Sequence, residues 1–178
     1  MKDPRLAVFL LTGSCLVLGA VPGAAAPILP TAGHVSDEIR SLSGLEAFRV
    51  VIDTEASTLS ETPIVAETLK SNIEKYLEGA GFRLEEDPAT PLFKVTLITR
   101  GDDRHEEVVA LSYQITVRQL VSIPRIDRKV LVPTYTLVHG ALLEKDDLRK
   151  HVDIELVKLA RFVIGRIRMA GMVEPVKE

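Results

Sequence analysis

The hydrophobic residues of this chain recur with two different periods, and the shorter one predicts strands. Apolar and polar side chains alternate in four stretches: residues 47–53, 93–97, 109–123 and 129–139. The third stretch is the longest, and only Gln119 breaks its apolar face, which holds Val109, Leu111, Tyr113, Ile115, Val117, Val121 and Ile123. Because proline cannot donate a backbone hydrogen bond to a neighbouring strand, Pro133 favours an edge position or a bulge in the fourth stretch.

The longer period, close to that of an α-helix, predicts two amphipathic helices. The first follows Thr62 and Pro63, a pair typical of a helix N-terminus, and ends near Gly79 and Gly81. Its apolar stripe consists of Val65, Leu69, Ile73, Tyr76, Leu77 and Ala80. The second covers residues 144–170, and its stripe consists of Leu148, Val152, Leu156, Leu159, Val163, Ile167 and Ala170.

These elements follow one another in the order β-α-β-β-β-α, which predicts an α+β fold. The expected architecture is a two-layer sandwich, with a mainly antiparallel four-stranded sheet and both helices on one face. Residues 47–172 form the single predicted domain, and residues 173–178 form a tail. Residues 26–46 are rich in Pro, Gly, Ser and Thr without a period, so we interpret them as a flexible arm or linker with a helical turn around residues 37–42.

The N-terminal segment has the pattern of a secretory signal peptide. Lys2 and Arg5 precede the apolar residues 6–21, and small residues follow at positions 23–26, which places cleavage after Ala25. A retained membrane anchor stays an alternative, although an apolar run of 16 residues is short for a bilayer. Cys15 also raises a lipoprotein interpretation, but the leucine expected three places before it is missing. We therefore expect an exported protein in the periplasm, with association to the outer membrane left open.

Composition removes several classes of function. The chain has 178 residues, 22 Lys and Arg against 25 Asp and Glu, and a formal net charge of −3, which argues against a general nucleic-acid binder. Cys15 is the one cysteine, so cleavage of the signal peptide would leave none. A cysteine-free chain excludes disulfides, thiolate catalysis and cysteine-based zinc sites.

The residues able to carry chemistry do not form a recognisable catalytic or metal-binding pattern. The turn at residues 102–107 is dense in Asp, Glu and His, but neighbouring side chains of a strand end point in opposite directions, which favours a solvated turn. His139 and His151 have no nucleophile at a known spacing. Asp53 and Glu55 follow the first strand, where acid/base groups could stand, but carboxylates at a strand end more often keep a loop soluble. The sequence therefore predicts no enzyme, no metal site and no cofactor.

Two polar faces are candidates for contact with a partner. On the third strand, the side opposite the apolar face offers Ser112, Gln114, Thr116 and Arg118, which suit either solvent or a protein or self-association interface. On the last helix, Lys158, Arg161 and Arg168 share a face that suits solvent, an acidic partner or anionic lipid headgroups. Any membrane contact of this helix would be peripheral.

Several segments resemble small domains of the bacterial envelope. They are the first strand (FRVVID), the end of the first helix (LEGAGFRL) and the paired strands (FKVTLIT and ALSYQITVRQLVSI). Over about residues 47–171, this order resembles domains related to the N-terminal domain of TolB, and also uncharacterised exported bacterial proteins. The resemblance implies a non-enzymatic module that docks on envelope partners, and it transfers no functional residue.

The sequence thus predicts a non-catalytic exported accessory or assembly subunit of a cell-envelope complex, acting through protein–protein docking. A periplasmic small-ligand-binding protein is the alternative, although the chain has no Trp and only three Tyr to line a pocket. A hydrolase of unknown type is a third hypothesis. A pocket containing His139 or Asp53 would favour ligand binding or hydrolysis, and a flat face with exposed apolar residues would favour docking.

Overall fold

The computed structural model describes residues 35–54, 66–102 and 104–172, which all fall in one unit, Val35–Glu178. The predicted signal peptide (1–25), the first part of the predicted arm and the tail (173–178) lie outside the described residues. The same holds for the predicted helix start at Thr62 and Pro63.

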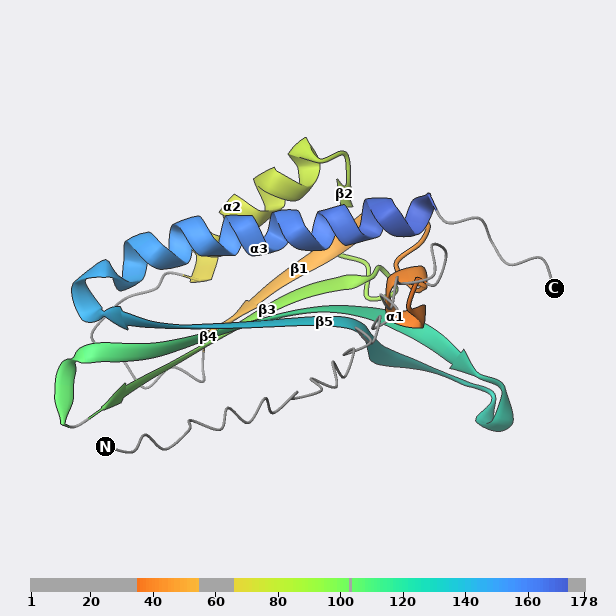
Figure 1. The fold of residues 1–178 in the computed structure, drawn as a ribbon. Coiled ribbons are helices and arrows are strands. Elements are labelled where there is room, and N and C mark those ends of the chain that lie inside the picture. Colours follow the sequence, from red (N-terminus) through yellow and green to blue (C-terminus); the bar gives the residue numbers. More distant parts are fainter. Residues whose placement is uncertain (1–34, 55–65, 103, 173–178) are drawn as a thin grey trace, which may run out of the picture. The chain divides into compact units, whose positions relative to one another are not determined.

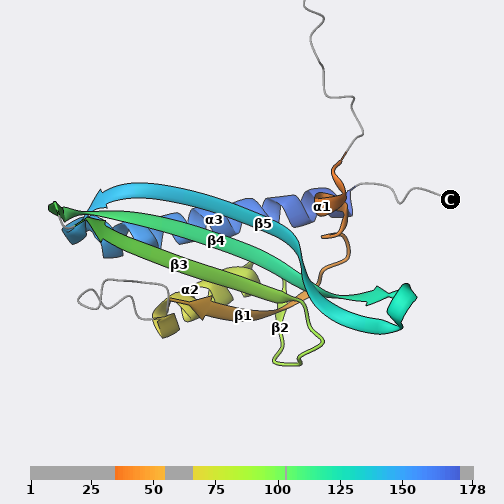
Figure 2. The same ribbon diagram turned by 90° about the horizontal axis from the view of Figure 1, so that it is seen from below.

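Five strands form one open sheet within the described residues. They are β1 (Ala47–Asp53), β2 (Arg83–Leu84), β3 (Leu92–Asp102), β4 (His105–Ile123) and β5 (Arg128–Glu144). The order across the sheet is β2-β1-β3-β4-β5. Strand β1 runs parallel to β2 and to β3, whereas β3, β4 and β5 are antiparallel. Strands β3, β4 and β5 lie side by side along most of the sheet (Figures 1 and 2).

The prediction of a four-stranded, mainly antiparallel sheet was wrong in two respects. The sheet has a fifth strand, β2, which pairs Arg83 and Leu84 with Ala47 and Phe48. Two residues are too few to show an alternating pattern, so periodicity could not reveal this strand. The sheet is also mixed, because β1 is parallel to β3. The direction of β1 depends on the path of the chain between the two strands, which the hydrophobic pattern does not encode.

Two helices cover one face of the sheet, as predicted. Helix α2 (Ala66–Gly79) and helix α3 (Leu148–Gly171) lie on the same side of the strands (Figure 1). Every residue of the predicted stripe of α3 is buried. The predicted start of this helix is instead a 3-10 turn, η2 (Lys145–Asp147). After α2, Gly81 adopts a φ of +96°, and the amide of Phe82 donates to the carbonyl of Leu77 at 3.1 Å, which closes the helix.

The core lies between the sheet and these two helices. Phe48 of β1 is fully buried, and its ring meets those of Phe82 and Phe93 edge-on, at centroid distances of 5.2 and 5.8 Å. The predicted helical turn around residues 37–42 is present as helix α1 (Asp37–Arg40). The following Leu42 is fully buried, so the end of the predicted arm packs on this core.

Strands β4 and β5 continue beyond the rest of the sheet as a two-stranded ribbon. The pairing of β3 with β4 begins at Leu92 and Arg118. Past this point, the last residues of β4 pair with the first residues of β5, and the 3-10 turn η1 (Pro124–Ile126) connects the two strands. We call this segment, residues 119–132, the ribbon. The ribbon projects from the body beyond the C-terminal end of α3 (Figures 1 and 2). The predicted buried face of β4 therefore ends early, and Val121 is 39% exposed.

The prediction for Pro133 is confirmed. Strand β5 is one of the two edge strands of the sheet. A shift in register also lies at this position, because Val117 pairs with Tyr135 while Arg118 pairs with Pro133. Thr134 is the extra residue of this bulge. The bulge marks the place where the ribbon leaves the body of the sheet.

Candidate functional site

The face of the sheet opposite the helices holds the polar residues that the sequence singled out. Figure 2 shows that no described helix covers this open face. Side chains on β4 alternate across the sheet, so Ser112, Gln114 and Thr116 lie opposite the buried Leu111, Tyr113 and Ile115. All three are half-buried among their neighbours on β3 and β5. Arg118 follows on the same face, where its Nη2 donates to the carbonyl of Leu131 at 3.3 Å.

Apolar side chains join the open face along the edge strand β5. Val138 pairs with Gln114 and is 64% exposed, and Leu142 pairs with Ala110 and is 76% exposed. At the opposite side of this face, Lys94 and Asp53 form an ion pair with an N–O distance of 2.8 Å. The open face is thus polar in the middle and apolar at its β5 edge.

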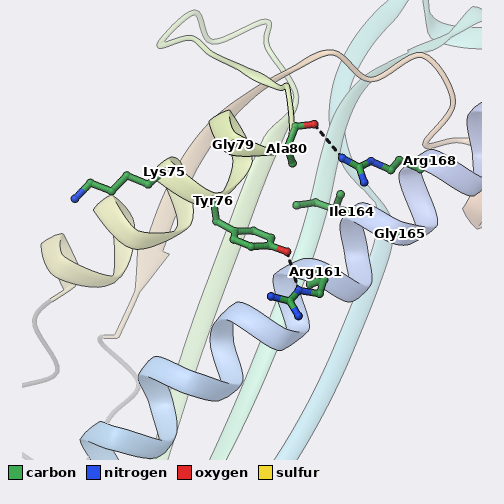
Figure 3. A pocket seen from close by; sticks show the side chains of 8 residues that line it. All are labelled: Lys75, Tyr76, Gly79, Ala80, Arg161, Ile164, Gly165 and Arg168. Atoms are coloured by element: carbon green, nitrogen blue, oxygen red, sulfur yellow. Dashed lines mark hydrogen bonds between the residues drawn. The ribbon is translucent and has the colours of Figure 1, made fainter.

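The three cations predicted to share one face of α3 are divided by the structure. The Nζ of Lys158 lies 3.0 Å from the Oε2 of Glu155 on the same helix. Arg161 and Arg168 instead reach across to α2 (Figure 3). The Nε of Arg161 donates to the hydroxyl of Tyr76 at 2.9 Å, and the Nη2 of Arg168 donates to the carbonyl of Ala80 at 3.2 Å. These two arginines therefore hold the end of α2 against α3.

A cleft of about 400 Å³ separates the two helices at these arginines. It is lined by Lys75, Tyr76, Gly79, Ala80, Arg161, Ile164, Gly165 and Arg168. The lining holds three cations and no carboxylate, although the side chain of Lys75 points away from the two arginines (Figure 3). The guanidinium of Arg161 also lies 5.8 Å from the centre of the Tyr76 ring. Such a cleft suits a small anion, because each guanidinium has further N–H groups to donate.

A second group of polar side chains lies between β4, β5 and α3, with Tyr113 buried and the side chain of His139 partly exposed. Tyr113 is fully buried, and its ring centre lies 6.1 Å from that of His139 and 6.4 Å from that of His151. Among the described residues, neither the hydroxyl of Tyr113 nor the Nε2 of His151 has a hydrogen-bond partner. The Nε2 of His139 is 3.7 Å from the Oε1 of Glu155.

The environment of this group shifts two pKa values. Burial raises the pKa of the Tyr113 hydroxyl above its ordinary value, and the charges of Glu155 and Asp153 raise it further. The hydrogen bond from Lys158 lowers the pKa of Glu155, against a smaller opposing effect of burial. Tyr113 is thus held as a neutral phenol, while Glu155 is held as a carboxylate.

The remaining candidate residues are not brought together. Within the ranges that the structure describes, no group of His, Cys, Asp and Glu side chains is arranged to hold a metal ion. Glu55 and Asp103 lie outside the described residues. The cleft between α2 and α3 and a second one near Gly81 and Phe82 are lined by residues other than His139 and Asp53.

The sequence did not predict two groups of side chains: Tyr113 with the histidines near it, and Arg161 and Arg168 with their hydrogen-bond partners. Tyr113 was assigned to the apolar face of its strand, and its closeness to His151 depends on how α3 crosses the sheet. The partners of Arg161 and Arg168 depend equally on the packing of two helices. Gln119, by contrast, did leave a signal, because it interrupts an otherwise apolar face.

Comparison with known proteins adds only weak similarities. No family model matches the sequence, and no curated protein matches it. A minor lipoprotein from Acinetobacter baumannii is 15% identical over 70% of this chain and 92% of its own, with a TM-score of 0.41. The hypothetical protein CT253 from Chlamydia trachomatis is 10% identical over 72% of this chain and 99% of its own, with a TM-score of 0.42.

The dodecameric PelC from Paraburkholderia phytofirmans is 12% identical over 76% of this chain and 91% of its own, with a TM-score of 0.39. All three TM-scores are low, so function has to be argued from the chain itself. The comparisons do not show the resemblance to the N-terminal domain of TolB, which stays a prediction. None of the helices in the described ranges is long and apolar enough to cross a membrane.

Proposed function

We propose that this chain is an exported, non-catalytic accessory or assembly subunit of the cell envelope that docks on a protein partner. The observation that carries the proposal is the open face of the sheet, with Val138 and Leu142 exposed along its β5 edge. A flat face with exposed apolar residues is typical of a docking surface. Export is supported by the signal-peptide pattern of residues 1–25.

The edge strand offers a second means of docking next to this face. Strand β5 is 17 residues long and lies at the end of the sheet. A long edge strand presents unpaired backbone groups, to which a partner can add a strand of its own. A partner bound to β5 would place its side chains beside Val138 and Leu142, and it would reach the polar row of Ser112, Gln114 and Thr116.

Site-specific crosslinking in cells tests this proposal. A photoreactive amino acid would replace Gln114, Val138 or Leu142 in a C-terminally tagged protein, and crosslinked products would be identified by mass spectrometry. Arg149 and Asp153, which are exposed on α3, serve as control positions. We expect one envelope protein to crosslink from the open face and not from α3. A tagged protein that stays uncrosslinked at all three open-face positions would overturn the proposal.

A second candidate function, binding of a small periplasmic ligand, is favoured by the cleft between α2 and α3. Its two arginines would bind an anion, and Tyr76 would form one wall. Titration with citrate and with inorganic phosphate, followed by calorimetry, tests this function. We expect any binding to be lost in Arg161→Gln and retained in Lys158→Gln. Equal binding by both variants, or none by the wild type, would remove this candidate.

A further inference from the structure

The ribbon (residues 119–132) consists of two strands, and β3 does not continue beside them. Its two strands pair from Gln119 and Val132 to Ile123 and Arg128, beyond the last pair of β3. A two-stranded hairpin is at best marginally stable in water when nothing covers it. Several of its apolar side chains are nevertheless exposed, namely Leu120, Val121, Ile126 and Val130.

These apolar residues lie on both faces of the ribbon. Leu120 pairs with Leu131, and the next pair along the ladder is Val121 with Val130. Successive pairs point to opposite faces of a strand pair, so each face carries one apolar pair. A flat protein partner would cover only one of these faces. A medium that surrounds the ribbon on all sides would cover both.

The tip of the ribbon is strongly cationic. Arg125, Arg128 and Lys129 are exposed around the turn, and Asp127 is the one carboxylate between residues 118 and 130. This local excess contrasts with the net charge of −3 of the whole chain. Ile126 stands between these charges and is 49% exposed. Apolar side chains surrounded by Lys and Arg are typical of segments that enter the headgroup region of an anionic membrane.

The base of the ribbon is fixed to the body of the molecule. The Nε2 of Gln119 donates to the carbonyl of Ser41 at 2.8 Å and to the Oγ1 of Thr134 at 2.7 Å. The Oγ1 of Thr134 donates to the carbonyl of Val117 at 3.3 Å. These bonds join the bulge of β5 to the residue that follows α1. The ribbon is thus held in a projecting position, which lowers the entropic cost of presenting its tip to a surface.

We propose that the ribbon docks on an anionic lipid surface. Ile126, Leu120 and Val121 would enter the boundary between headgroups and acyl chains, while Arg125, Arg128 and Lys129 would contact lipid phosphates. A symmetric contact between the ribbons of two copies is disfavoured, because it would bring the same three cations of each copy together. This inference goes beyond the proposed function and does not depend on it, since the open face of the sheet stays available to a protein.

Co-sedimentation with vesicles tests the electrostatic part of the inference. The probes are vesicles of phosphatidylcholine alone and of phosphatidylcholine mixed with phosphatidylglycerol, with protein purified in the form that cells export. The triple variant R125Q/R128Q/K129Q should bind mixed vesicles about 100-fold more weakly than the wild type. The control R100Q/R149Q/K150Q removes the same charge from exposed positions of β3 and α3, and should lose less than about fivefold.

Tryptophan fluorescence tests the insertion of the tip. The chain has no Trp, so Ile126→Trp introduces a single reporter. Ile154→Trp is a matched control, because Ile154 on α3 is also 49% exposed. We expect mixed vesicles to shift the emission of the first variant to the blue and to leave the second unchanged. Equal shifts in the two variants, equal losses in the two triple variants, or no binding of the wild type would overturn the inference.

Discussion

Two parts of the same strand pair show how differently one sequence pattern can be used. Residues 109–117 of β4 alternate between apolar and polar side chains, and Val121 and Ile123 continue the same apolar register into the ribbon. In the first part, here called the covered part, the inward side chains are buried under α3. In the ribbon, Val121 continues the same alternation and is 39% exposed. Alternation therefore specifies a strand, and burial requires a second layer that the strand itself does not encode.

The apolar side chains of the two parts also serve different purposes, namely stability of the fold and docking. The covered part contributes to the core, so its apolar side chains stabilise the fold. Those of the ribbon are partly exposed, and we propose that they act in docking. The same substitution should therefore have different effects in the two parts. In the covered part it should mainly lower the free energy of unfolding, and in the ribbon it should mainly weaken docking.

The largest expected effect is that of shortening a covered leucine. Leu111→Ala removes a fully packed side chain and leaves a cavity, so it should lower the free energy of unfolding by about 3 kcal/mol. Leu120→Ala in the ribbon should lower it by less than about 1 kcal/mol. Chemical denaturation followed by circular dichroism measures both. Equal losses would mean that the ribbon is as well packed as the body of the sheet.

A smaller effect is expected at the junction between the two parts. Gln119→Leu removes the hydrogen bonds to Ser41 and Thr134, and should cost about 1 kcal/mol. Because the loss is local, amide hydrogens of residues 119–132 should exchange faster with solvent, while those of the covered part keep their protection. Gln114→Leu on the open face is the control and should leave the exchange of the ribbon unchanged. Uniform acceleration along β4 would contradict a local anchor.

Much of the fold was predictable because long elements carry strong periods. The bounds of β1 agree with the predicted stretch of residues 47–53, and the predicted stripe of α3 is buried throughout. Pro133 correctly indicated an edge position or a bulge, and the structure has both at this position. In each case a chemical property of the residues themselves, either hydrophobic spacing or a missing N–H group, determines the local structure.

What could not be predicted depends on contacts between elements. The two residues of β2 are too short for a pattern, and the parallel direction of β1 follows from the path of the chain. Lys158, Arg161 and Arg168 share a face by spacing, yet Glu155, Tyr76 and Ala80 decide where each points. The end of the buried face at Val117 is likewise set by the place where α3 stops covering the sheet.

Helix α3, which lies over the covered part, should make the stability of the fold depend on pH in the acid range. Because Lys158 lowers the pKa of Glu155 in the folded state, this carboxylate stabilises the fold above its unfolded pKa. That stability is lost as the pH falls through the lower, folded pKa. Lys158→Met should therefore flatten the fall in stability between about pH 5 and pH 3. Lys150→Met, on the same helix, should leave the slope unchanged. An unaltered slope in Lys158→Met would show that the pair does not act on stability.

The smallest expected change concerns two buried tyrosines, Tyr113 of the covered part and Tyr135, which pairs with Val117 of that part. The hydroxyl of Tyr113 has no hydrogen-bond partner among the described residues, so Tyr113→Phe removes a polar atom whose burial is uncompensated. Its free energy of unfolding should stay the same or rise by up to about 1 kcal/mol. Tyr135 is also buried, and burial raises the pKa of its hydroxyl, but the nearby Arg166 opposes this effect and so interacts favourably with the hydroxyl. Tyr135→Phe should therefore lower the free energy of unfolding by about 1 kcal/mol. Thermal denaturation compares the two variants, and a loss for Tyr113→Phe as large as that for Tyr135→Phe would mean that a buried water satisfies the Tyr113 hydroxyl.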